Sequence, residues 1–196
     1  MNSDYGGFIL LAIAGIALSY LAFDTYVNGE VEPVKSTVDG RTYIVRSLPD
    51  KQDAANLLAE IRERCVSLVT HLNKSVPEDP RTQRLVNNFN PDSVSEGKDT
   101  KGRFTSYSIN KGEKIILCLR ARNKDNTLED VNTMMFVTIH ELAHICTVSI
   151  GHTDEFWENF KWLLEQSVDM GIYVQVDYKK DPQDYCGIKI TSNPLN

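Results

Sequence analysis

The sequence predicts an α+β fold, with one small twisted sheet and several amphipathic helices, preceded by a single transmembrane helix. Three segments repeat apolar residues every three or four positions, which is the period of helices with one buried face. Short β-branched runs bounded by turn signals are typical of strands. Residues 5–23 contain no charge, as in a membrane span. We therefore divide the chain into a transmembrane anchor (1–27), a linker (28–40) and one globular domain (41–196).

The anchor prediction rests on the apolar run between Asp4 and Asp24. Its helical length of roughly 28 Å is close to one hydrocarbon core. No basic residue precedes the run, which favours an uncleaved anchor over a cleaved secretory signal. Lys35, Arg41 and Arg46 follow it, so the positive-inside rule predicts a single-pass membrane protein whose globular domain is cytosolic.

The first elements of the domain follow the linker. The linker itself carries Gly, Pro and charges without an apolar period. Residues 42–46 are expected to form a short strand, and the Pro49-Asp50 pair precedes a long helix expected over 51–73. The polar stretch after this helix is expected to contain one helical turn at 81–86. These elements predict a scaffold with no catalytic group of its own.

A hairpin and two further helices complete the domain. Residues 104–109 and 114–122 are β-rich runs joined by a turn that contains glycine, which predicts a hairpin. Helices are expected over 128–148 and 154–170. The C-terminal run 172–178 is expected to be a strand or an extended tail.

Composition argues against a broad nucleic-acid surface. The net charge is −6 and the pI is near 5.2, whereas binding to phosphates requires clustered Lys and Arg. One basic stripe, interrupted by Glu113 and Asp125, is expected to be a solvated face. The stripe comprises Arg103, Lys111, Lys114, Arg120, Arg122 and Lys124. We therefore expect no nucleic-acid partner.

The cysteines indicate no metal knuckle. Cys65, Cys118, Cys146 and Cys186 lie far apart and form no C-x-x-C pair. Buried free thiols are the simpler expectation. Because the count is even, an oxidising compartment permits disulfides, and the sequence leaves the pairing open.

The motif His140-Glu141-Leu142-Ala143-His144 lies within the helix expected over 128–148. Imidazoles four residues apart lie on one face of a helix, so both can bind one zinc ion. Glu141 can then lie beside the zinc-bound water and accept its proton as general base. For the motif alone, a helix with two surface histidines and a salt-bridging glutamate is the structural alternative.

A third zinc ligand is needed, because catalytic zinc has three protein ligands and one open position. His152 follows a glycine at the turn between the two helices, so we expect it to fold back toward the metal. Glu165 is the alternative, since thermolysin-like zinc peptidases take a glutamate from a downstream helix. It lies three turns into its helix, so His152 is favoured. Cys146 points to another face than His144.

The C-terminal segment offers donors for a developing oxyanion. Tyr173, Tyr178 and Tyr185 are the candidates, and the sequence does not choose among them. The alternative for each is an ordinary packing tyrosine.

HELAH followed by GHTDEFW resembles the zinc signature of small metallopeptidases of the WLM and SprT-like kind, in which a histidine near the start of the next helix completes the site. The resemblance begins at the run KIILCLRAR (114–122). It implies a zincin-like core whose active-site helix and following helix supply the ligands, with KIILCLRAR as the edge strand above the cleft. An extended polypeptide could pair with that edge.

The sequence thus predicts a zinc metallopeptidase that uses Zn2+ as cofactor and polypeptides as substrates. His140, His144 and His152 are the predicted metal ligands, and Glu141 is the predicted catalytic base. Two alternatives remain: a catalytically silent zincin-fold interaction module at a membrane, and a DNA-directed processing protease, against which the acidic balance argues. Cleavage preference and oligomeric state are not specified.

Overall fold

The structure, a computed structural model, describes Gly15, Ser19 and residues 31–98, 105–122 and 125–196. The strands are β1 (Val31–Lys35), β2 (Thr42–Arg46), β3 (Val94–Glu96), β4 (Tyr107–Ile109), β5 (Lys114–Leu117), β6 (Gln183–Tyr185) and β7 (Ile188–Ile190). The helices are α2 (Lys51–Ser75), α3 (Pro80–Asn88), the 3-10 turn η1 (Pro91–Ser93), α4 (Val131–Cys146) and α5 (Asp154–Asp169). The α+β class is confirmed.

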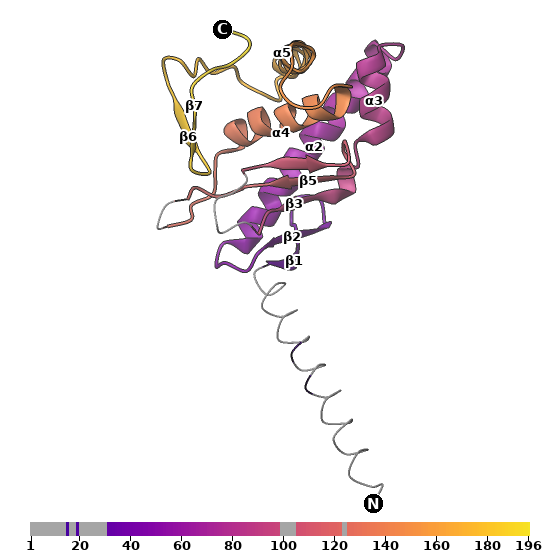
Figure 1. The fold of residues 1–196 in the computed structure, drawn as a ribbon. Helices are drawn as coiled ribbons and strands as arrows, with labels where there is room; N and C mark the ends of the chain where they lie inside the picture. Colours follow the sequence, from indigo (N-terminus) through magenta and orange to yellow (C-terminus); the bar gives the residue numbers. More distant parts are fainter. Residues whose placement is uncertain (1–14, 16–18, 20–30, 99–104, 123–124) are drawn as a thin grey trace, which may run out of the picture.

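Strands β1 to β5 form one layer, in which β1 pairs with β2, and β5 lies between β3 and β4, whereas β6 and β7 pair with each other apart from this layer (Figure 1). β2 runs beside β3, and the backbone N–H of Arg46 donates to the Glu96 carboxylate at 2.7 Å. β3 and β5 are parallel, whereas β4 and β5 form the antiparallel hairpin expected from sequence. The sheet is therefore mixed, and its order depends on a parallel partner from outside the hairpin.

The expectation that KIILCLRAR is the edge strand is wrong. Because β3 occupies the far side of β5, the strand at the edge is β4, the other arm of the hairpin. β5 also ends at Leu117, and beyond it Arg120 forms an isolated bridge with Leu128. The strand beside the helix α4 is thus Tyr107–Ile109.

The helices cover one face of this layer. α2 packs against β1, β2 and β3, α4 packs against β4, and the two helices contact each other. Side chains on β2 alternate, with Tyr43 and Val45 buried and Ile44 exposed, so only one face of this strand is covered. α5 packs on α4 from the other side, which gives three layers with α4 in the middle. The motif at residues 140–144 therefore lies on the helix in the middle layer.

The domain begins earlier than the sequence suggests. Residues 31–35, inside the segment predicted as a linker, form β1 and pair with β2 in register from Val31↔Arg46 to Lys35↔Thr42. Pro33 is tolerated because β1 is an edge strand. The C-terminal run expected to be a strand at 172–178 is irregular, and the strands of that region are β6 and β7.

The predicted membrane location is wrong by the present structure. Among the residues that the structure describes, no helix has both the length and the apolarity needed to cross a bilayer. The apolar run on which the anchor prediction rests lies outside the described residues, apart from Gly15 and Ser19. The cytosolic placement of the domain, which depends on that anchor, is not retained.

A buried ion pair ties the sheet to α2. Arg120 is 3% exposed, and its guanidinium bonds the Glu96 carboxylate at 2.8 Å and also bonds Asp50. Asp50 precedes α2 but makes no side-chain cap, because its carboxylate is held by Arg120. Arg120 is therefore not part of a solvated stripe, contrary to the sequence-based expectation.

Replacing Glu96 by glutamine should lower the free energy of unfolding by about 3 kcal/mol, because it leaves the buried guanidinium of Arg120 without its buried charge partner. Urea denaturation measures this. The exposed pair between Arg41 and Asp92 is the matched control, and Arg41→Gln should cost less than about 1 kcal/mol. Equal effects of the two changes would contradict a structural role for the buried pair.

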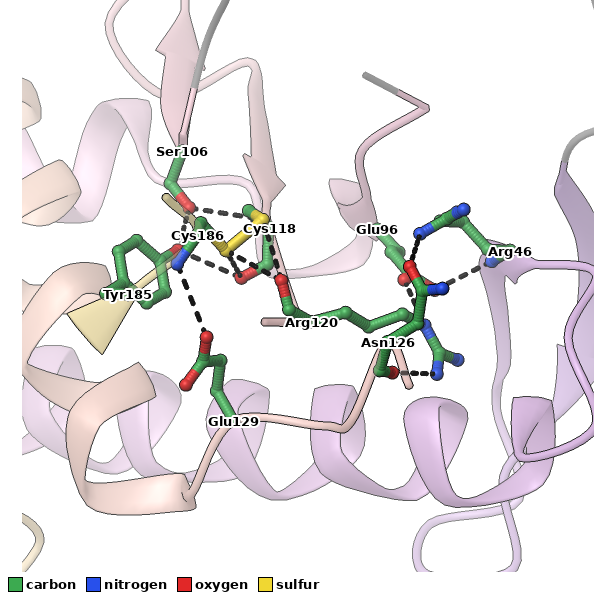
Figure 2. Close-up of a disulfide and its surroundings, with 9 residues drawn as sticks. All are labelled: Arg46, Glu96, Ser106, Cys118, Arg120, Asn126, Glu129, Tyr185 and Cys186. Atoms are coloured by element: carbon green, nitrogen blue, oxygen red, sulfur yellow. Dashed lines mark hydrogen bonds and ion pairs between the residues drawn. A yellow bond between two sulfur atoms is a disulfide. The ribbon is translucent and has the colours of Figure 1, made fainter. Parts of the chain in front are cut away.

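A disulfide joins Cys118, just after β5, to Cys186 in the turn between β6 and β7 (Figure 2). The Tyr185 hydroxyl donates to the Cys118 carbonyl at 3.0 Å and lies 2.5 Å from the Ser106 hydroxyl. The C-terminal hairpin is thus bound to the sheet at several points. Cys65 and Cys146 are buried thiols, as the simpler expectation had it, and burial raises the pKa of each to about 12.

Because 68 residues separate the paired cysteines, the link should contribute about 4 kcal/mol by restricting the unfolded chain. We expect Cys118→Ser/Cys186→Ser to lose most of this, measured by thermal or urea unfolding. Cys65→Ser provides the contrast, since it removes a buried thiol and no link. Unchanged stability of the double variant would show that the hairpin is held without the bond.

Candidate active site

Three histidines converge at the end of α4. The ring centroids of His140, His144 and His152 lie 4.9 Å apart in each of the three pairs. One nitrogen from each ring lies within 4.8 Å of the other two, and Nε2 of His140 is 3.0 Å from Nε2 of His152. Nitrogens bound to one zinc ion at ~2.0–2.1 Å stand roughly 3.3 Å apart, so small side-chain adjustments suffice for a shared ion. The donor set fits zinc.

The imidazoles of His140 and His144 are held neutral, as metal ligands must be. Burial, together with smaller contributions from the neighbouring His144 and His152, lowers the pKa of His140 to about 3. Burial also lowers the pKa of His144 to about 4, with contributions from His152 and Lys111. A neutral ring keeps a lone pair free for a cation.

Phe156 packs against all three rings from the first turn of α5. Its ring stacks on His144 at 4.3 Å and meets His140 and His152 edge-on at 4.8 and 4.7 Å. The Phe156 side chain is fully buried. This contact fixes ring orientation, which for a metal site is as important as the identity of the ligands.

The turn from α4 to α5 carries His152 back to its partners. The Thr147 hydroxyl accepts from the Asn159 amide at 2.9 Å, which joins the end of α4 to α5. The Glu155 carboxylate accepts the backbone N–H groups of Val148 at 3.0 Å and Ser149 at 3.1 Å. These bonds lower the pKa of Glu155 to about 2, so its charge persists at any ordinary pH. Thr153 caps α5.

Glu141 lies in the same cleft, on the side of α4 that faces β4. Its side chain is buried, and burial raises its pKa to about 7, while hydrogen bonds from Ser108 on β4 act in the opposite direction. Ser108 thus faces the carboxylate from the edge strand. A cation beside the group would favour its charged form.

The cleft around these groups has a volume of about 600 Å³. Its lining comes from β4 and the turn that follows it, from α4, from the turn at 150–152 and from the C-terminal hairpin. Side chains from elements far apart in sequence therefore surround the histidines. Such a concave site beside perturbed titratable groups is typical of an active site.

Comparison with known proteins identifies the family. The WLM domain matches residues 38–193. The chain belongs to the WLM family. An uncharacterised protein of Acanthamoeba polyphaga mimivirus is 35% identical over 191 residues, which cover 95% of both chains. The family relationship therefore spans the whole described domain.

A further relative of this WLM chain is more distant. The DNA-dependent metalloprotease Wss1 of Saccharomyces cerevisiae is 25% identical over 140 residues, covering 68% of this chain and 46% of Wss1. A crystal structure of Wss1 superposes with a TM-score of 0.50 at 24% identity, covering 65% of this chain and 87% of that one. At this identity the superposition shows a shared fold.

The cleft contains some, but not all, of the candidate site residues that the sequence offered. The structure brings His140, Glu141, His144 and His152 together. Glu165 is exposed on α5 and does not line the cleft, so the structure does not support it as the third ligand. The thiol of Cys146 is buried and directed at the Ala143 carbonyl. The geometry therefore favours His152 over Glu165 and Cys146 as the third ligand.

The candidate tyrosines are separated by the fold. Tyr173 and Tyr178 are buried beside Phe136 in the core, with ring centroids 6.0 and 4.8 Å from it, and do not line the cleft. Tyr185 does line the cleft, but its hydroxyl is engaged by Ser106 and the Cys118 carbonyl. None of the three presents an uncommitted hydroxyl to the histidines, so the oxyanion role is not supported.

Sequence reasoning missed Ser108 and the apolar walls. Ser108 belongs to a strand whose sheet position depends on β3, and no local pattern identifies an edge. Glu155 was recognisable only as a charge in the first turn of a helix. Its hydrogen bonds to Val148 and Ser149 can be recognised only in the folded structure.

Replacing Glu155 by glutamine should weaken zinc binding by about tenfold, because the turn that carries His152 loses its charged acceptor. Competition with a chromophoric chelator measures the dissociation constant. Glu158→Gln, one turn closer to the middle of α5 and exposed, is the control and should bind as wild type does. Equal affinity of all three proteins would show that the turn is rigid without Glu155.

Proposed function

We propose that this chain is a zinc-dependent metallopeptidase that hydrolyses peptide bonds. The observation that carries the proposal is the convergence of His140, His144 and His152 with a buried Glu141 in one cleft. Membership of the WLM family and the similarity to a metalloprotease support it. The three histidines would hold Zn2+, which would lower the pKa of a water toward ~7 and polarise the scissile carbonyl.

The chain's own groups supply the proton transfers. Glu141 accepts a proton from the attacking water and delivers it to the leaving amine. Its burial and the facing Ser108 hold the carboxylate in the cleft. Lys111, from the β4–β5 turn, donates to the carbonyls of Thr147 at 2.6 Å and Ser149 at 3.0 Å. These bonds connect the β4–β5 turn to the segment that follows α4.

The polypeptide substrate would lie along β4. In the described part of the chain, β4 pairs with β5 on one side and with no strand on the other. The Ser108 backbone N–H donates to the Glu141 carboxylate, which places the outer edge of β4 beside the proposed base. An extended chain added to this edge would carry a peptide carbonyl past the histidines.

A peptide-cleavage assay tests the proposal. We expect the full chain, loaded with one equivalent of zinc, to cleave an unstructured protein such as casein. Dipicolinate should abolish the activity by removing the metal, and added Zn2+ should restore it. Zinc binding without cleavage of any substrate would favour the alternative, a catalytically silent interaction module.

DNA dependence is the second candidate property, because the yeast relative is a DNA-dependent metalloprotease. The described basic stripe gives it little support, since Arg120 is buried and Lys111 is bonded to backbone carbonyls. The same assay with and without single-stranded DNA decides the point. Cleavage that requires DNA would correct the expectation that nucleic acid is not a partner.

A further inference from the structure

The cleft has an apolar end next to the histidines. Phe136 and Val137 precede His140 and Glu141 by one turn of α4, and all four line the cleft. One helical turn advances ~5.4 Å, so these two apolar side chains lie one turn from the proposed ligand and base. Ile188 and Ile190 on β7 line the same cleft. A side chain beside the reacting bond would therefore meet apolar groups.

The hairpin presents its apolar face to the cleft. Tyr185 pairs with Ile188 across the strands, and Ile190 lies two residues on, so these side chains share one face. All three line the cleft. Lys189 lies on the opposite face, where it forms an ion pair with Asp184 at 3.8 Å. Two faces of one short hairpin thus differ in both polarity and surroundings.

This wall is held in place while part of it stays open to solvent. The disulfide fixes the turn of the hairpin to the end of β5, and the backbone N–H of Cys186 donates to Glu129 at 3.3 Å (Figure 2). The turn residues Cys186 and Gly187 have φ of 47° and 82°, as a two-residue hairpin turn requires. Ile188 nevertheless remains 50% exposed. A ligand in the cleft would cover an apolar surface that is already fixed in position.

We propose that Ile188 and Ile190, which line the same cleft as Phe136 and Val137, form with them a specificity subsite that binds a large apolar side chain next to the scissile bond. The inference rests on the proposed peptidase function and adds its substrate class. The subsite has no charged side chain among these four residues, so Leu, Met or Phe is favoured over Ala, Asp or Lys.

Matched peptides test the subsite on the full chain. First, mass spectrometry of casein fragments identifies which flanking position carries apolar residues. Peptide pairs that differ only there, Leu against Ala, are then compared for kcat/KM. Hydrophobic pockets discriminate by about 10–200-fold per group, so we expect a Leu/Ala ratio of at least about tenfold in the wild type.

Ile188→Ser and Ile190→Ser should lower this ratio toward one while hydrolysis of the Ala peptide is retained. Lys189→Ser, between them on the other face, should keep the wild-type ratio. Far-UV circular dichroism verifies that each variant is folded. Cleavage without apolar enrichment, or an unchanged ratio in both isoleucine variants, would overturn the subsite and leave the peptidase function standing.

If the wild-type protein cleaves no peptide, peptide binding to Glu141→Gln still tests the subsite separately from the peptidase function. Fluorescence anisotropy with the zinc-loaded protein measures the affinity of the same Leu and Ala peptides without turnover. Tighter binding of the Leu peptide that is lost in Glu141→Gln/Ile188→Ser supports the subsite even if the peptidase function fails. Equal binding of both peptides overturns it.

Discussion

Glu141→Gln is expected to keep its zinc and to lower kcat/KM by about 10³-fold, within the range found for loss of a general base. The substitution changes the chemistry of the side chain and leaves its size unchanged. Glutamine has the size of glutamate, so the cleft and the three histidines are undisturbed, but an amide cannot accept the proton of the attacking water. Zinc content by atomic absorption and cleavage of a fluorogenic peptide are measured on the same preparation.

Two comparisons show whether the loss is chemical. Glu141→Asp retains a carboxylate but retracts it by one methylene, so it should fall between wild type and Glu141→Gln. Glu158→Gln removes an exposed carboxylate on α5 and should have no effect. Turnover by Glu141→Gln at the wild-type rate would rule out Glu141 as the base.

The second large effect is expected for His152→Ala. Loss of one of three imidazoles should weaken zinc binding by more than about 100-fold, the upper range for loss of an outer-shell partner. Activity should fall in parallel, because the metal would be absent from most of the protein. The measurement is a chelator competition at fixed pH, since protons compete with zinc for imidazole.

Glu165→Ala is the decisive control for this prediction. Glu165 is exposed on α5 and outside the cleft, so its loss should leave the zinc affinity unchanged. His71→Ala removes an exposed histidine of α2 and tests for nonspecific loss of imidazole. Zinc loss in Glu165→Ala with retention in His152→Ala would reverse the assignment of the third ligand.

The active-site helix could be predicted from sequence because its information is local. Two histidines and a glutamate in five residues fix a common helical face, whatever the helix packs against. The turn to His152 was also predictable, since Gly151, with φ of 85°, and Thr153, which caps α5, mark the end of one helix and the start of the next. The structure brings these residues together as that pattern indicates.

The walls of the cleft could not be predicted, because they depend on contacts between distant segments. The edge position of β4 follows from the parallel pairing of β3 with β5, which no local pattern specifies. The partner of Cys118 lies 68 residues away, and four cysteines allow several pairings. The prediction of a membrane span at residues 5–23 used only the length and the polarity of the run, which contain no information on tertiary contacts.

X-ray absorption at the zinc K-edge tests most directly whether three imidazoles of this chain share one zinc ion. For the wild-type protein with one equivalent of metal, we expect three imidazole nitrogens at ~2.0–2.1 Å and one further light atom. The spectrum of His152→Ala should show one imidazole fewer. A sulfur ligand at ~2.3 Å, or fewer than three imidazoles in the wild type, would contradict the proposed metal centre.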